Sequence, residues 1–200
     1  RTVLAGLPQI TFGRYTGETA DKARDAENEF LQNNPGERRL PNELLSRDEM
    51  RATPPHLLLT NYAMLEYLLL RPADIDLFDG PHSGTWRFLV MDEAHVYDGA
   101  QGSEVALLIR RLKQRVAPGA NLQCIATSAS LTGSVRNDPH GEAMDFATNL
   151  FDAPFEYVEG DAERQDLVEP VRKDHLPAAT WSLTGEQLLG QRADSGRRVG

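Results

Sequence analysis

Two adjacent carboxylates and a histidine form the most chemically informative part of this 200-residue sequence. They lie in the tetrapeptide Asp92-Glu93-Ala94-His95, directly after the apolar run from Trp86 to Met91, which predicts a buried strand. Open parallel sheets bind ligands at the carboxyl ends of their strands. Because neighbouring side chains of a strand point to opposite sides, we expect the two carboxylates to perform different tasks. One could hold a hydrated Mg²⁺, and the other could orient or deprotonate a water that attacks a phosphoryl group.

The tetrapeptide resembles the DEAH form of motif II in superfamily 2 helicases. Ser128-Ala129-Ser130 follows the next predicted strand and resembles motif III, which is usually Ser-Ala-Thr. Upstream, residues 58–65 (LLTNYAML) resemble motif Ib, and Tyr15-Thr16-Gly17 resembles the glycine turn between motifs Ia and Ib. Residues 97–112 are similar to large bacterial DEAD/DEAH helicases of the DNA-repair and phage-defence kind. The resemblance covers about residues 8–158.

This resemblance implies ATP and Mg²⁺ as cofactors, and it implies a role for each residue of the acidic motif. Glu93 would be the catalytic carboxylate for ATP hydrolysis, and Asp92 would coordinate Mg²⁺ through water. His95 would couple the nucleotide site to motif III, where Ser128 and Ser130 would receive that coupling through their hydroxyl groups. Without its neighbours, His95 would be interpreted as a surface histidine, and the two serines as a polar turn at a strand end.

Four other residues are predicted to contact a nucleic-acid strand: Arg14, Gly17, Thr60 and Asn61. Thr60 and Asn61 stand at a predicted helix N-terminus, where N–H groups and the helix dipole favour a phosphate. Plain N-capping by Asn61 is compatible with that role. Arg14 and Tyr15, close to Gly17, could add a phosphate contact and a stacking surface. A tyrosine at such a position is, however, more often part of the core.

Short β-type runs alternate with helical segments, which predicts βαβ units and a parallel sheet. The clearest unit runs from Trp86 to Thr127 and contains an amphipathic helix that begins at Ser103. With the resemblance, this pattern predicts an α/β, three-layer RecA-like domain with a mainly parallel central sheet over residues 1–158, incomplete at its N-terminal side. Residues 159–200 are predicted to be a linker or the start of another module. The other predicted strands are 9–15, 56–60, 122–126 and 155–158, and the other predicted helices are 20–31, a short helix from Arg47, a helix after Asn61, and 142–150.

Composition excludes several classes of protein. The formal net charge is −9, so the chain is not a general binder of polyanions, which requires clustered Lys and Arg. The single cysteine, Cys124, excludes an internal disulfide framework and a cysteine-rich zinc site. Apolar runs are far shorter than the roughly 18 residues that span a bilayer, and no signal peptide opens the sequence. We therefore expect a cytoplasmic protein that does not enter a membrane.

The phosphate-binding loop of superfamily 2 motors is absent from this sequence. That loop has the form G-x-x-x-x-G-K-[ST], and none of the three lysines, Lys22, Lys113 and Lys173, follows a glycine. We expect the chain, which begins at Arg1 without Met, to be a piece of a longer helicase or translocase. The longer protein would provide the second RecA-like domain, hydrolyse ATP and move on a nucleic acid, which we expect to be DNA. The isolated chain would not hydrolyse ATP.

Two alternatives belong to other classes of function. A metal-dependent hydrolase could use Asp92, Glu93, His95 and Asp98, and it would bind a transition metal tightly. A helicase-like domain could also serve as a non-catalytic interaction module.

Overall fold

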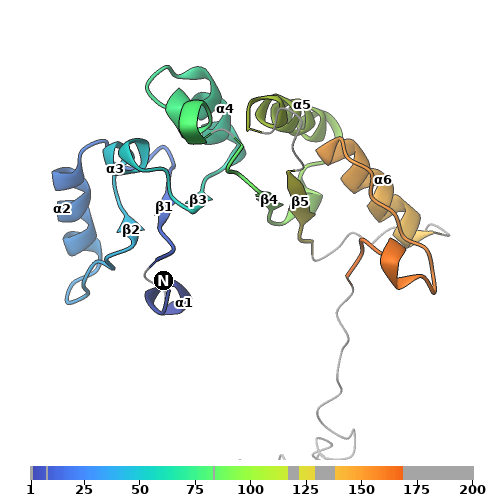
Figure 1. Ribbon diagram of the computed structural model, residues 1–200, viewed down its shortest axis with the longest axis horizontal. Coiled ribbons are helices and arrows are strands. Elements are labelled where there is room, and N and C mark those ends of the chain that lie inside the picture. The colour runs from blue at the N-terminus through green and yellow to red at the C-terminus, as the bar shows by residue number, and fades with distance from the viewer. Residues whose placement is uncertain (1, 8, 83, 117–121, 129–137, 169–200) are drawn as a thin grey trace, which may run out of the picture. The chain divides into compact units, whose positions relative to one another are not determined.

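The computed structural model describes residues 2–7, 9–82, 84–116, 122–128 and 138–168 of the chain. Short strands alternate with helices along these residues, and every pair of hydrogen-bonded strands runs parallel (Figure 1). The predicted α/β class with parallel strands is therefore confirmed. Within the described ranges, hydrogen bonds join the strands into two groups, in the orders β2-β1-β3 and β4-β5.

The elements are short, and their bounds are as follows. The strands are β1 (Phe12–Arg14), β2 (Glu43–Leu44), β3 (Leu57–Leu59), β4 (Phe88–Met91) and β5 (Gln123–Ala126). The helices are α1 (Thr2–Ala5), α2 (Ala23–Asn33), α3 (Arg47–Ala52), α4 (Tyr62–Leu70), α5 (Gly99–Val116) and α6 (Pro139–Phe151). The short 3₁₀ helices are η1 (Ile75–Leu77), η2 (Gly80–His82), η3 (Ala94–Val96) and η4 (Ala162–Arg164).

In the first group of strands, β1 and β3 end at the same edge. Arg14 lies opposite Leu59 in the parallel register, and the pairing continues for one more hydrogen bond, from Tyr15 N to the Leu59 carbonyl at 2.8 Å. Gly13 of β1 lies close to Met50: a Cβ at this position would be 2.5 Å from the Met50 sulfur, so a larger residue would have to displace that buried side chain. The residues that follow β1 and β3 therefore leave the sheet side by side.

The second group is the predicted strand-helix-strand crossover, which is confirmed. β4 and β5 are parallel, Met91 lies opposite Ala126, and α5 connects the two strands. The helix begins at Gly99, four residues before the predicted start at Ser103. Glycine normally disfavours a helix, but at position 102 it is required, since a Cβ would lie 2.7 Å from the carbonyl oxygen of Tyr97.

Two helix starts follow their sequence signals closely. Ser46 and Glu49 form the predicted capping box at the start of α3, with both reciprocal hydrogen bonds present. Asn61 caps α4, and its side-chain oxygen accepts a hydrogen bond of 2.8 Å from the backbone N–H of Met64. The first residue of each helix is therefore defined by a bond between residues three positions apart.

Apolar side chains form two clusters that share helix α5. Tyr15, Leu68 and Leu108 belong to the first cluster, which joins α4 and α5 beneath β3 and β4. Ile109 and Phe151 belong to the second cluster, which joins α5 and α6 to β4 and β5. Both clusters include the half-buried Leu89 of β4 as a packing partner. The strand that leads into the acidic motif is therefore anchored in both clusters.

The prediction of a buried strand at residues 86–91 is wrong for one face of β4, and β3, in the predicted strand at 56–60, is exposed in the same way. Alternate apolar residues of these strands are exposed, with Phe88 60% and Val90 56% exposed on β4. Leu57 and Leu59 of β3 are exposed to 45% and 55%. Helices α4, α5 and α6 cover the face of β4 that carries Leu89, whereas Phe88 and Val90 leave its opposite face exposed. At β4, the described residues therefore contribute one of the two helical layers expected on either side of the sheet.

Two predicted strands differ from the structure. The strand predicted at residues 9–15 is limited to Phe12–Arg14. The strand predicted at 155–158 is only an isolated antiparallel bridge between Tyr157 and Gln165, because residues 159–161 turn the chain back on itself.

The predicted domain boundary at 158 stays a prediction, since the chain after Val168 lies outside the described residues. No described helix is both long and apolar enough to cross a membrane.

Candidate functional site

Asp92 is the first residue after β4, and it is bonded to the residue that follows β5. Thr127 Oγ1 donates a hydrogen bond to Asp92 Oδ1, and it also accepts one of 3.2 Å from the backbone N–H of Glu93. Glu93 N–H lies 3.2 Å from Asp92 Oδ1 as well. Because the two strands are parallel, their carboxyl ends bring Asp92 and Thr127 together. These bonds orient one oxygen of an exposed carboxylate at the sheet edge.

Glu93 has a left-handed backbone conformation, with φ 50° and ψ 45°. A residue with a Cβ adopts this conformation at a cost of about 1 to 3 kcal/mol, and such residues concentrate at functional sites. Two hydrogen bonds maintain it: Ala94 N–H donates to the Thr127 carbonyl at 2.8 Å, and Val96 N–H donates to the Glu93 carbonyl at 3.0 Å. The chain thereby turns sharply after Asp92, so the two carboxylates have different partners.

His95 lies between Glu93 and the serine of the motif III segment. Its Nδ1 is 3.2 Å from Glu93 Oε2 and 3.3 Å from Ser128 Oγ. With a proton on Nδ1 the ring donates to either partner, and with that proton on Nε2 the ring accepts from the Ser128 hydroxyl. The structure thus brings together Asp92, Glu93, His95 and Ser128, whereas Ser130, the fifth residue predicted to lie beside them, is outside the described residues.

The chemistry of this group fits a magnesium ion held through water better than a directly bound transition metal. Among the described residues, no three His, Cys, Asp or Glu side chains are placed to hold a metal ion together. Asp98, a ligand in the alternative hydrolase hypothesis, instead accepts a hydrogen bond of 2.6 Å from the Gly99 N–H at the start of α5. A single exposed Asp carboxylate is typical of Mg²⁺ sites, in which the ion keeps several waters.

The four residues predicted to contact nucleic acid lie at the shared edge of β1 and β3. Arg14 ends β1 and Thr60 follows β3, and both are exposed, as are Gly17 and Asn61. The first turn of α4 contributes amide groups, since an α-helix offers no internal carbonyl partner to its first N–H groups. The exposed Arg14 and the N-terminus of α4 therefore lie at the same edge of the sheet.

Tyr15 is part of the core, so its predicted role as a stacking surface is wrong. The side chain is fully buried, and its hydroxyl donates a hydrogen bond to Asp74 Oδ1. Arg51 completes the group: its Nε lies 2.7 Å from Asp74 Oδ1, and its Nη2 donates to the Tyr15 hydroxyl at 3.0 Å. Burial, together with the neighbouring Asp74 carboxylate, raises the pKa of Tyr15 to about 12.

The turn that contains Gly17 is held by Arg47, a residue that sequence patterns did not single out. Arg47 Nη2 donates hydrogen bonds of 3.0 Å to the carbonyl groups of both Thr16 and Gly17. Its guanidinium also lies 5.5 Å from the centre of the Tyr15 ring. The available signal was the spacing of Arg47 and Arg51, because two residues four positions apart share one face of a helix.

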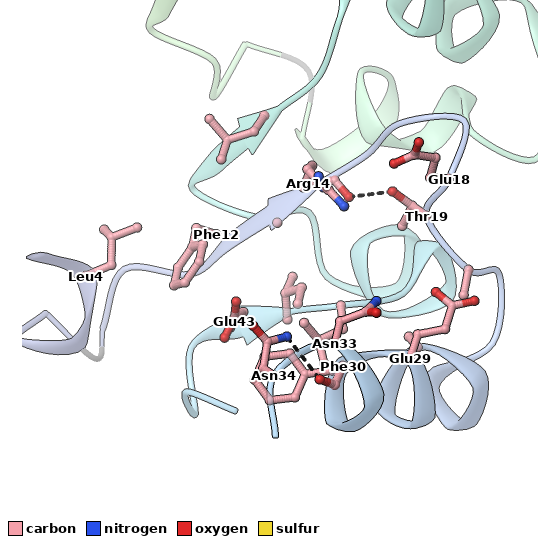
Figure 2. A pocket seen from close by; sticks show the side chains of 16 residues that line it. Leu4, Phe12, Arg14, Glu18, Thr19, Glu29, Phe30, Asn33, Asn34 and Glu43 are labelled. Atoms are coloured by element: carbon pink, nitrogen blue, oxygen red, sulfur yellow. Dashed lines mark hydrogen bonds between the residues drawn. The ribbon is translucent and has the colours of Figure 1, made fainter. Parts of the chain in front are cut away.

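A cavity of about 490 Å³ opens between β1, β2 and α2 (Figure 2). Figure 2 shows the hydrogen bond of 2.8 Å from Thr19 Oγ1 to the Arg14 carbonyl, which closes the turn after β1 at one end of the cavity. Glu18, Glu29 and Glu43 line the cavity. Three carboxyl groups disfavour phosphate, so this cavity is not a candidate for the nucleotide.

Two solved helicases have parts similar to this chain. Mycobacterium smegmatis helicase Lhr, in a structure with single-stranded DNA and AMP-PNP, is 25% identical, with a TM-score of 0.42 over 68% of this chain and 13% of Lhr. The DUF1998 helicase MrfA, in a structure with DNA, is 22% identical, with a TM-score of 0.42 over 76% of this chain and 20% of MrfA.

Sequence comparison gives a more extensive match. Druantia protein DruE of Escherichia coli (strain UMEA 4076-1) is 35% identical over 208 residues, which cover 94% of this chain. The chain corresponds to only 11% of the length of DruE. The DEAD/DEAH box helicase family profile matches residues 33–138, more than half of the chain and including the acidic motif. The chain therefore belongs to the DEAD/DEAH box helicase family.

Proposed function

We propose that this chain provides the hydrolytic carboxylates, and part of the nucleic-acid grip, of an ATP-dependent helicase or translocase that acts on DNA. The observation that carries the proposal is the position of His95, whose Nδ1 lies within 3.3 Å of both Glu93 and Ser128. One imidazole thereby connects the acidic motif with the segment after β5. Motors need such a connection, since hydrolysis must be transmitted to the parts that move.

In the proposed reaction, Asp92 and Glu93 have different tasks. Bound Mg²⁺-ATP would supply the phosphoryl group and the charge that polarises it. Asp92 would hold the metal through water, with its carboxylate oriented by the Thr127 hydroxyl. Glu93 would orient the attacking water and accept its proton, and its carboxylate lies beside His95 rather than beside Thr127. His95 would hold Glu93 in place or release it, depending on its bond with Ser128.

The proposed grip on the strand is local and agrees with the net negative charge of the chain. Thr60 and Asn61 would meet a backbone phosphate at the N-terminus of α4, where the helix dipole is favourable. Arg14 would neutralise a second phosphate, and the Gly17 turn would allow the strand to approach the protein backbone closely. DNA is proposed as the strand because residues 97–112 resemble bacterial DNA-repair and phage-defence helicases.

Other parts of the longer protein must complete the nucleotide site. None of the three lysines follows a glycine, so the loop that cradles the β and γ phosphates has to come from outside these 200 residues. A second RecA-like domain would supply the opposite wall of the site. We propose that the 200-residue chain alone does not hydrolyse ATP.

The test is ATP turnover by the full-length protein, measured alone, with single-stranded DNA, and with RNA of the same sequence. We expect turnover to require Mg²⁺ and to rise with DNA more than with RNA, and we expect the protein to displace a strand from a partial duplex. An equal or larger rise with RNA would contradict the choice of DNA. The absence of turnover under all three conditions would instead indicate a non-catalytic interaction module.

A further inference from the structure

Helix α4 and the segment after the acidic motif meet through three side chains outside the site described above. Gln101 Nε2 donates a hydrogen bond of 3.1 Å to the hydroxyl oxygen of Tyr62. The rings of Tyr62 and Tyr97 meet edge to face, with centroids 5.8 Å apart and planes at 81°. Tyr62 is the first residue of α4 and follows Asn61 directly. Tyr97 comes directly after η3, which contains His95.

This contact is not needed to attach α4 to the core. Four other side chains of the helix, at most 9% exposed, anchor it there: Met64, Leu65, Leu68 and Leu69. Tyr62 is 36% exposed, and its hydroxyl has a hydrogen-bond partner that is itself exposed. The hydrogen bond between Tyr62 and Gln101 therefore lies at the surface, outside the buried side chains that anchor α4.

From Tyr97, the connection to the acidic motif is short and rigid. Tyr97 N–H donates to the Ala94 carbonyl at 3.0 Å, and Tyr97 packs against the second apolar cluster, which includes the fully buried Ala94. The backbone of Gly102, one residue after Gln101, lies against the Tyr97 carbonyl with no room for a Cβ. A displacement of Tyr97 would therefore move the 3₁₀ turn that carries His95, and with it the contact between His95 and Glu93.

We propose that Tyr62, Tyr97 and Gln101 are positioning residues that transmit strand binding at the N-terminus of α4 to Glu93 and His95. The inference rests on the proposed function, because it requires a nucleic-acid strand at Asn61 and hydrolysis at Glu93. A phosphate at the first turn of α4 changes the position or mobility of Tyr62, and the Tyr97 and Gln101 contacts carry that change to η3. The path consists of the contacts of Tyr62 with Gln101 and with Tyr97, followed by the 3₁₀ turn η3.

The test uses the full-length protein and measures ATP turnover without DNA and with saturating oligothymidine. Tyr62→Phe keeps the ring and removes the hydroxyl group, whereas Gln101→Leu removes the donor. For both variants we expect turnover without DNA and DNA affinity without nucleotide to equal those of the wild type. We expect the maximal stimulation by DNA to fall by about fivefold. The double variant should lose no more stimulation than either single variant, since both remove one shared bond.

Two further variants separate coupling from a structural effect. Gln101→Glu preserves a hydrogen bond, because the Tyr62 hydroxyl then donates to the carboxylate, so stimulation should recover to near the wild-type level. Tyr67→Phe is the matched control, since Tyr67 lies on the same helix and is 61% exposed. It should behave like the wild type.

The outcomes that overturn the proposal are distinct. Wild-type stimulation in both Tyr62→Phe and Gln101→Leu would contradict the coupling and leave the proposed function intact. Loss of DNA affinity in these variants would show that the residues serve binding rather than transmission. A wild-type protein whose turnover does not respond to DNA would overturn the proposed function, and the coupling with it.

Discussion

Thr127 Oγ1 donates a hydrogen bond to Asp92 Oδ1, although 35 positions separate the two residues in the sequence. The bond exists because β4 and β5 are parallel and end in register, with Met91 opposite Ala126. The same hydroxyl group accepts the Glu93 N–H at 3.2 Å, so one threonine orients both residues of the acidic pair. A side chain outside the acidic motif thus defines the geometry of that motif.

Thr127→Val is expected to weaken the affinity of the site for magnesium, so that turnover requires a higher Mg²⁺ concentration. Valine has the shape of threonine without the hydroxyl group, so Asp92 loses the donor that orients its carboxylate. Loss of such a supporting bond typically costs about 10- to 100-fold in metal affinity or activity. The measurement is ATP turnover of the full-length protein as a function of Mg²⁺ concentration. Thr127→Ser, which keeps the hydroxyl group, should stay close to wild type, and equal Mg²⁺ curves for Val and Ser would contradict the role of Thr127.

Tyr15 should make the stability of the domain sensitive to alkaline pH. Its folded-state pKa is about 12, above the ordinary value of 10.0, because the hydroxyl is buried beside the Asp74 carboxylate. The unfolded state therefore releases this proton first as pH rises. The stabilisation is complete below pH 10 and is lost as pH rises toward 12.

The measurement is urea unfolding of wild type and Tyr15→Phe over this pH range. The difference in the free energy of unfolding should change between pH 10 and 12, with wild type losing more stability, and should be constant below pH 10. Tyrosinate absorbance provides an independent check, since the substitution should remove a group that titrates near 12. A constant difference over the whole range would show that Tyr15 titrates normally.

Arg47→Ala is expected to lower the affinity for single-stranded DNA without changing ATP turnover in its absence. The substitution removes two hydrogen bonds that hold the carbonyl groups of Thr16 and Gly17, and a net contribution of about 1 kcal/mol for each predicts a loss of up to about 30-fold. Arg47→Lys should not restore the affinity, because the planar guanidinium makes these contacts. Fluorescence anisotropy with a labelled oligonucleotide measures the effect. Arg24→Ala, at an exposed position of α2, is a control that removes the same charge. An equal loss of DNA affinity in this variant would show that Arg47 acts only through the net charge.

Local signals predicted the elements that depend on neighbouring residues. The capping box of Ser46 and Glu49 and the cap at Asn61 are confirmed because each is a bond between residues three positions apart. The crossover from β4 to β5 is confirmed because an amphipathic helix between two apolar strands has few alternatives. The predicted family is also confirmed, because the acidic motif that indicates it is a contiguous stretch of sequence.

The parts that the sequence did not predict depend on contacts between distant segments. Tyr15 is buried because Arg51 and Asp74, from two other elements, satisfy its hydroxyl group, and no pattern around Tyr15 indicates those partners. The roles of Thr127 and Arg47 likewise emerge only when strands and helices are placed together. The exposure of Phe88 and Val90 follows from what covers the sheet, which a run of apolar letters cannot specify.

The central claim is that Glu93 is the carboxylate that activates water for ATP hydrolysis. The direct measurement compares single-turnover ATP hydrolysis and ATP binding in the full-length protein and in its Glu93→Gln variant, with saturating single-stranded DNA. The amide has nearly the same shape but cannot accept the proton, so we expect binding to be retained and hydrolysis to fall by about 10²- to 10⁴-fold. Hydrolysis by Glu93→Gln at the wild-type rate would contradict the account.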